Sequence, residues 1–148
     1  MTVSFGWSPS LPLVGAEFGA LAGRLRSFRI PLNRAIRQVV IPSFMANFDA
    51  EGRPAWPPLS AETIATRLNR GFGAGPILQR SGRLKAVMGQ VNIWTVNSQE
   101  AYIHGLPSEV SYGGIHDSGT RPFAYLQPED GDKIERIFEE YIIERIGL

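Results

Sequence analysis

The chain has 148 residues, 43% of them hydrophobic, and a formal net charge of +1 at neutral pH. This length suits one domain with one core, and the lack of cysteine excludes disulfides, thiolate metal sites and a cysteine nucleophile. There is no apolar run of about 18 residues and no signal-peptide pattern, so we expect a soluble protein that is not exported by that route.

Two helical patterns are predicted in the N-terminal third. Apolar side chains recur every three or four residues in residues 13–28 and again in residues 31–48. Pro42 is expected to kink or divide the second helix, because proline has no N–H and crowds the preceding turn. We therefore expect a helical hairpin or a bent pair of helices. The first helix is weakened by three glycines, Gly15, Gly19 and Gly23.

The next segment is predicted to be mostly irregular. Three prolines and one glycine in residues 49–59 exclude a regular ladder and indicate a loop. Ser60 is a suitable N-cap for a short helix that ends near Asn69. Residues 71–76 are rich in glycine and indicate a connector, and residues 77–84 are predicted to form a turn or a short helix.

A small sheet is predicted after this segment. β-branched residues alternate in residues 86–98, which indicates a strand, and residues 101–104 are its expected antiparallel partner across a turn at residues 97–99. Phe123 and Tyr125 also alternate with smaller residues and indicate one aromatic strand face, which we expect to lie in the core.

The C-terminal helix has the strongest local signals. Gln127 occupies the expected N-cap, Pro128 suits the first helical position, and Glu129 and Asp130 place carboxylates where the helix dipole favours them. Its expected apolar face consists of Ile134, Ile137, Phe138, Tyr141, Ile142 and Ile146. Together the elements predict an α+β fold, in which a small antiparallel sheet packs against helices in one domain over residues 1–148.

Charge is divided unevenly along the chain. Residues 1–90 carry eleven Lys and Arg against four Asp and Glu, a net charge of +7, whereas residues 91–148 carry four against ten, a net charge of −6. Three interpretations stay open: opposite faces that attract subunits to each other, a basic face for nucleic acid, and solvated helix faces within one domain.

Residues suited to catalysis are few. His116, Asp117 and Ser118 are the residue types of a hydrolase triad, but adjacency in sequence does not give the convergent geometry that a triad needs. His104, His116 and Asp117 lack the spacing of a zinc site. We therefore predict a protein that is not an enzyme and that uses no cofactor and no metal.

Four short segments stand in an order that resembles a known family. Residues 48–60 contain Trp-Pro-Pro-Leu, residues 76–84 contain Ser-Gly-Arg-Leu, residues 102–104 read Tyr-Ile-His, and residues 121–130 begin with Arg-Pro-Phe. This order and spacing, over residues 32–146, resembles the phage virion morphogenesis family of Mu-like phages and prophages. Residues 112–116 are an alternative match for the tyrosine and histidine element.

The resemblance implies a structural protein of the virion. Members of this family act in tail completion, in which subunits form a ring of six at the head-proximal end of the tail, end tube growth and join the tail to the head. The implied partners are further copies of the chain, the tail tube protein and a head-completion or connector protein, with DNA passing through the lumen and no membrane contact. Assembly is expected in the host cytoplasm, and the implied fold is that of tail-terminator and connector proteins.

The motifs also supply candidate residues for the contact between subunits: Arg53, Trp56, Arg80, Arg83, Arg121 and Phe123. Trp56 has two interpretations, an anchor on a neighbouring subunit or a part of its own core, and the core interpretation is favoured. The arginines have three interpretations, bridges between subunits, a lining of the lumen or solvated surface charges, and the solvated interpretation is favoured for each one taken singly. The alternative function is nucleic-acid binding by the basic N-terminal helices, through Arg24, Arg26, Arg29, Arg34 and Arg37.

Overall fold

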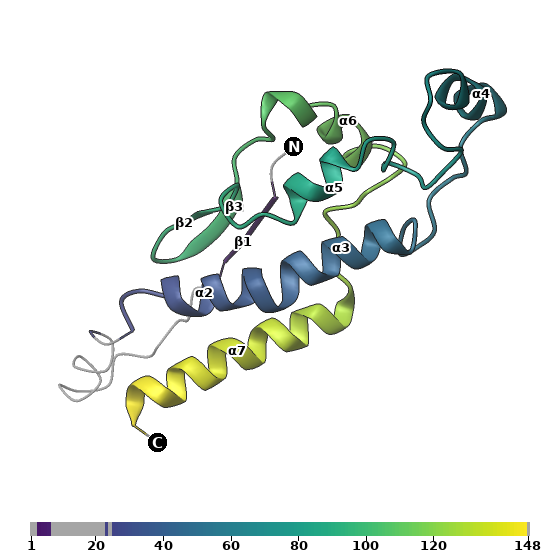
Figure 1. The fold of residues 1–148 in the computed structure, drawn as a ribbon. Coiled ribbons are helices and arrows are strands. Elements are labelled where there is room, and N and C mark those ends of the chain that lie inside the picture. The colour runs from purple at the N-terminus through teal and green to yellow at the C-terminus, as the bar shows by residue number, and fades with distance from the viewer. Residues whose placement is uncertain (1–2, 7–22, 24, 148) are drawn as a thin grey trace.

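The computed structural model describes residues 3–6, 23 and 25–147 and has the predicted α+β fold (Figure 1). The elements are, in chain order, β1 (Val3–Gly6), α2 (Arg29–Ala35), η1 (Ile36–Val40), α3 (Ile41–Asp49), α4 (Ala61–Asn69), α5 (Arg83–Met88), β2 (Thr95–Val96), β3 (Glu100–Ile103), η2 (Ser108–Val110), α6 (Gly113–Asp117) and α7 (Pro128–Ile146). Among the described helices, none is long and apolar enough to cross a membrane.

One helical rod, made of α2, η1 and α3 in succession, crosses the middle of the molecule (Figure 1). The prediction that Pro42 divides this helix is wrong, because α2, η1 and α3 follow one another without a break. Just before Pro42, η1 is a π-helical turn in which the Ile41 N–H donates to the Ile36 carbonyl. Bonding to the carbonyl five residues back widens the turn just before Pro42. The wider turn accommodates a proline that has no N–H to donate to the carbonyl four residues back.

Helix α7 packs antiparallel along α2 and η1 (Figure 1). The Phe28 ring lies 5.8 Å from the Phe138 ring and 6.3 Å from the Tyr141 ring, and the Tyr141 hydroxyl donates to the Ser27 carbonyl over 3.1 Å. Gln127 and Asp130 form the capping box that begins the helix. The predicted C-terminal helix is thus confirmed, with its start and its apolar face.

The sheet has three antiparallel strands in the order β1-β3-β2. The predicted partner strand and the turn before it are confirmed, and the Asn97 side-chain oxygen accepts from the backbone N–H groups of Gln99 and Glu100, each over 2.8 Å. The predicted strand over residues 86–98 is mostly wrong, since only β2 within it is extended. Of the residues that suggested this strand, Val87 is buried in α5, whereas Val91 is 37% exposed in the turns that precede Trp94.

Other predicted elements have mixed outcomes. The loop over residues 49–59 is confirmed, as is the Ser60 cap, whose hydroxyl accepts from the Thr63 N–H over 3.1 Å. The strand predicted around Phe123 is wrong, because residues 121–127 are irregular and their backbone is held by side chains. The helix predicted over residues 13–28 lies mostly outside the described residues, and its last four residues are not helical.

The packing of α7 predicts the effect of truncating Phe138, which is 3% exposed. Phe138→Ala should lower the free energy of unfolding by about 3–5 kcal/mol, because it removes the ring that fills the space beside Phe28. Urea denaturation followed by circular dichroism measures this change. The exposed neighbour Glu139→Ala serves as the control, and equal stabilities of the two variants would contradict the docking of α7.

Candidate functional site

An aromatic cluster joins residues 48–60 to residues 121–130. The Phe48 ring lies 5.9 Å from the Trp56 ring and 5.2 Å from the Phe123 ring. The Trp56 indole N–H donates to the Pro122 carbonyl over 3.0 Å, and Trp56 and Phe123 are 6% and 0% exposed. Both candidate interface residues therefore lie in the core of their own subunit.

A buried amide connects the same segments through polar contacts. Asn47 is fully buried, and its side-chain nitrogen donates to the carbonyls of Phe123 and Tyr125, each over 2.8 Å. Its side-chain oxygen accepts from Arg53 Nε over 2.9 Å. The third candidate interface residue, Arg53, is thus half-buried and committed to contacts within the subunit.

The network continues from Arg53 to the start of α7. Arg53 Nη2 donates to the Ser43 carbonyl over 2.8 Å and to the Ser43 hydroxyl over 3.0 Å, and that hydroxyl donates to Asp130. Burial raises the pKa of Asp130, but hydrogen bonds from Ser43 and from the Gln127 N–H, together with the charge of Lys133, outweigh burial and lower it. Asp130 is therefore a carboxylate at neutral pH, buried but fully bonded.

The segment over residues 76–84 is fastened to the neighbouring loops. The Ile77 N–H donates to a Glu51 carboxylate oxygen over 2.7 Å, and the Gln79 side-chain amide donates to the Phe48 carbonyl over 2.8 Å. Arg121 bridges to the proline loop, where its Nη2 donates to the Pro57 carbonyl over 3.1 Å. These contacts hold the segment that precedes α4 against residues 76–84 and against Arg121.

A cleft of about 750 Å³ lies between α4 and α6, and we call it the arginine cleft. Its lining includes three arginines, Arg67, Arg80 and Arg121, but only one carboxylate, Glu62. Hydroxyl groups from Ser60, Thr63, Thr66 and Ser81 also line it. The cleft is therefore rich in hydrogen-bond donors and carries a positive net charge at neutral pH.

Arg67 is the most unusual member of the cleft, because it is 5% exposed and yet lacks an anionic partner among the described residues. Its Nη1 donates to the Pro76 carbonyl over 3.1 Å, while its Nε has no acceptor in the described part of the chain. A buried guanidinium without a counter-ion is costly, since the lost hydration is not replaced.

His116 lines the same cleft and does not add to its charge at neutral pH. Burial lowers the pKa of His116, and the positive charge of Arg121 lowers it further. Its ring stands at 83° to the Tyr112 ring, 6.4 Å away. The imidazole is therefore neutral at pH 7.

The residue types of a hydrolase triad next to His116 are used for structure. Asp117 Oδ1 accepts from the backbone N–H groups of Phe123 and Ala124 over 3.0 and 2.8 Å, and the Ser118 hydroxyl donates to the Gly114 carbonyl over 2.8 Å. In the described residues no group of three or more His, Asp and Glu side chains is placed to hold a metal ion.

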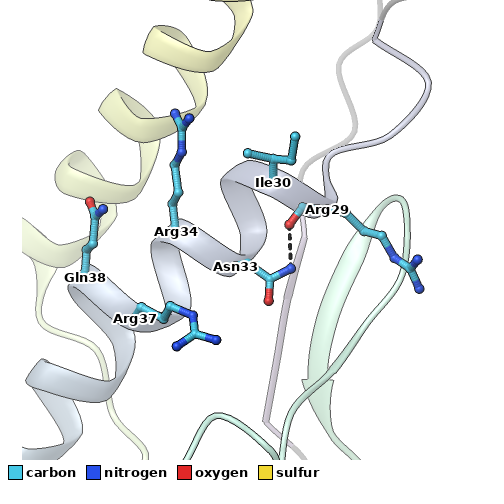
Figure 2. A pocket seen from close by; sticks show the side chains of 6 residues that line it. All are labelled: Arg29, Ile30, Asn33, Arg34, Arg37 and Gln38. Atoms are coloured by element: carbon cyan, nitrogen blue, oxygen red, sulfur yellow. Dashed lines mark hydrogen bonds between the residues drawn. The ribbon is translucent and has the colours of Figure 1, made fainter.

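A second basic surface lies on α2 and η1, where a groove of about 340 Å³ is lined by Arg29, Arg34 and Arg37. Figure 2 shows Arg34 directed toward α7 and Arg29 toward the β2–β3 hairpin. Arg34 forms a 3.4 Å ion pair with Glu144, and Arg29 Nη2 donates to the Val96 carbonyl over 3.2 Å. Two of these arginines thus have partners within the subunit.

The sequence-based candidates are consequently divided among three places. Trp56, Phe123 and Arg53 lie in the core or its polar network, Arg80 and Arg121 lie in the arginine cleft, and Arg83 is exposed at the start of α5 outside that cleft. Sequence reasoning missed Arg67, because an arginine on a polar helix is normally exposed and nothing local signals its burial. Arg24 lies outside the described residues.

No protein-family model, curated protein or solved structure matches this chain.

The network around Asp130 predicts a pH-dependent stability. Because its pKa is lower in the folded than in the unfolded chain, the stabilisation is complete above the ordinary value of 3.8 and is lost as the pH falls through the folded-state pKa. Asp130→Asn should therefore cost about 2 kcal/mol at pH 7 and much less at pH 2. Urea unfolding at both pH values measures this, with the exposed Asp132→Asn as control. An equal cost at both pH values would contradict the carboxylate role.

Proposed function

We propose that this chain is a structural protein of a tailed-phage virion, which completes the tail. In this proposal, copies of the chain form a ring at the head-proximal end of the tail, end the growth of the tube and join the tail to the head. The proposal rests on the resemblance of four segments to the phage virion morphogenesis family. The α+β fold, with its small sheet against helices, is compatible with it.

The observation that carries the proposal is that two of the four resembling segments, residues 48–60 and residues 121–130, meet in one buried framework. Phe48, Trp56 and Phe123 come from segments up to 75 residues apart and contact each other through their rings. Arg53 and Asn47 bond to backbone and side-chain groups of the same segments. These residues hold the subunit together, so contacts with other subunits would use the surface outside this framework.

Charge supplies a physical route to a ring. The described exposed acids are concentrated on α7, while the arginine cleft lies beside α4. Two different surfaces of opposite sign favour a head-to-tail contact, and such contacts close into a ring when their rotation permits.

Nucleic-acid binding through the basic N-terminal helices is the alternative, and the groove that Arg29, Arg34 and Arg37 line is the observation in its favour. The partners that Arg29 and Arg34 already have within the subunit reduce their availability for phosphate contacts. Tail completion is therefore the preferred function.

Deleting this chain from the phage that encodes it tests the proposal. Electron microscopy should then show overlong tails or tails without heads, whereas particles with the chain should show joined tails and a ring of density at the tail top. Supplying the wild-type chain in trans should restore joined tails and is the control. Normal joined tails without the chain would contradict the proposal and favour nucleic-acid binding.

A further inference from the structure

The arginine cleft has the chemistry of a site for an anion. Arg67, Arg80 and Arg121 line it, and Glu62 is the one carboxylate among its lining residues. Arg67 is buried, with 5% of its surface exposed, and its Nε has no acceptor among the described residues. A buried cation in this condition is stabilised when an anionic group enters the cleft.

The chain itself carries a surface with the complementary charge. Asp132, Glu135 and Glu139 are exposed on α7 and follow one another at spacings of three and four residues, which places them on one face of the helix. The exposed Arg136 lies on the same face, so the three carboxylates outnumber it and the face has a net negative charge. In the part of the chain that the structure describes, none of the three forms a salt bridge. We call this surface the acidic face of α7.

The arginine cleft and the acidic face of α7 each have an exposed apolar or aromatic side chain beside their charged groups. Ile143, four residues beyond Glu139, is 47% exposed on the same side of α7. Tyr112, which lines the arginine cleft, is 43% exposed. A contact between the two surfaces would therefore combine charge pairs with the burial of an aromatic and an aliphatic side chain.

The two surfaces belong to different sides of one subunit. Figure 1 shows α4 projecting from the far end of α3, while α7 runs along the opposite side of the central rod. The acidic face and the arginine cleft can therefore meet only between two copies of the chain.

We propose that the arginine cleft receives the acidic face of α7 from a second copy of this chain. This inference rests on the proposed ring and identifies its subunit contact. Each copy supplies one cleft and one acidic face, so the contact is heterologous and repeats around the ring. Carboxylates of the neighbouring α7 supply the counter-charge for Arg67. Arg80 and Arg121 line the same cleft and add to its positive charge.

A nucleic-acid backbone is a poorer occupant of this cleft. Duplex DNA presents its phosphates on a convex surface, which exposed cations contact, whereas the guanidinium of Arg67 is buried. The acidic face of α7 presents carboxylates on side chains that extend from a helix, and these can enter a cleft. Each copy of the chain that carries an arginine cleft also carries one acidic face of α7.

Reversal of one charge on each surface tests the contact. Arg80→Glu is suitable because Arg80 is exposed and its one described contact is with the Phe72 ring, 5.0 Å from the guanidinium carbon. Arg80→Glu alone and Glu139→Arg alone should each weaken the assembly of the purified full chain at least about tenfold, because like charges then face each other. Mass photometry, with the chain alone and with the tail tube protein, measures the assembly.

The combined variant and a matched control make the test specific. Arg80→Glu together with Glu139→Arg should restore much of the assembly, since opposite charges again face each other across every contact. Arg70→Glu makes the same charge change at the end of α4, outside the cleft lining, and should assemble like the wild type. Circular dichroism should show the same folded spectrum for all variants.

Each contrary outcome has a distinct meaning. If the two single variants, Arg80→Glu and Glu139→Arg, each assemble as the wild type does, the contact is overturned while the ring remains. If Arg80→Glu loses affinity for a labelled DNA duplex but assembles normally, the cleft binds phosphate and the contact is also overturned. If the wild-type chain forms no oligomer, alone or with the tail tube protein, both the contact and the proposed function are overturned.

Discussion

The buried amide of Asn47 is the constraint on which the rest of the structure depends. It bonds to the carbonyls of Phe123 and Tyr125 and accepts from Arg53, so one side chain on the central rod holds two irregular segments. Residues 121–127 have no strand ladder to satisfy their backbone, and without Asn47 the carbonyls of Phe123 and Tyr125 would lose these donors. The position of Trp56 and the approach to α7 follow from this arrangement.

This constraint separates the residues that specify the fold from those available for partners. Trp56 and Phe123 are buried against Phe48, so their contribution to an assembly is to shape the subunit. The surfaces left for partners lie outside the framework, at the arginine cleft and along the acidic face of α7. In the proposed ring, the framework therefore acts by holding these two surfaces at fixed positions, and charge complementarity selects the partner.

Sequence reasoning succeeded where the signals were local and failed where packing decided. The capping box of Gln127 and the cap of Ser60 are satisfied within one helical turn, so α7 and α4 were predictable. The π turn before Pro42 was not predicted, and the β-branched residues before Trp94 lie in turns and not in a strand. Within the candidate site, Arg80 and Arg121 were found through motifs. The role of Arg67 depends on a carbonyl at Pro76, which only the folded chain brings near.

The most direct test of the proposed ring and its subunit contact is a cryo-electron microscopy reconstruction of the tail end at side-chain resolution. We predict a closed ring of this chain in which α7 of each copy lies in the arginine cleft of its neighbour, with carboxylates beside Arg67. A ring in which that cleft faces solvent or DNA would contradict the assigned contact. A tail end that contains no copy of the chain would contradict both the proposed tail completion and the proposed subunit contact.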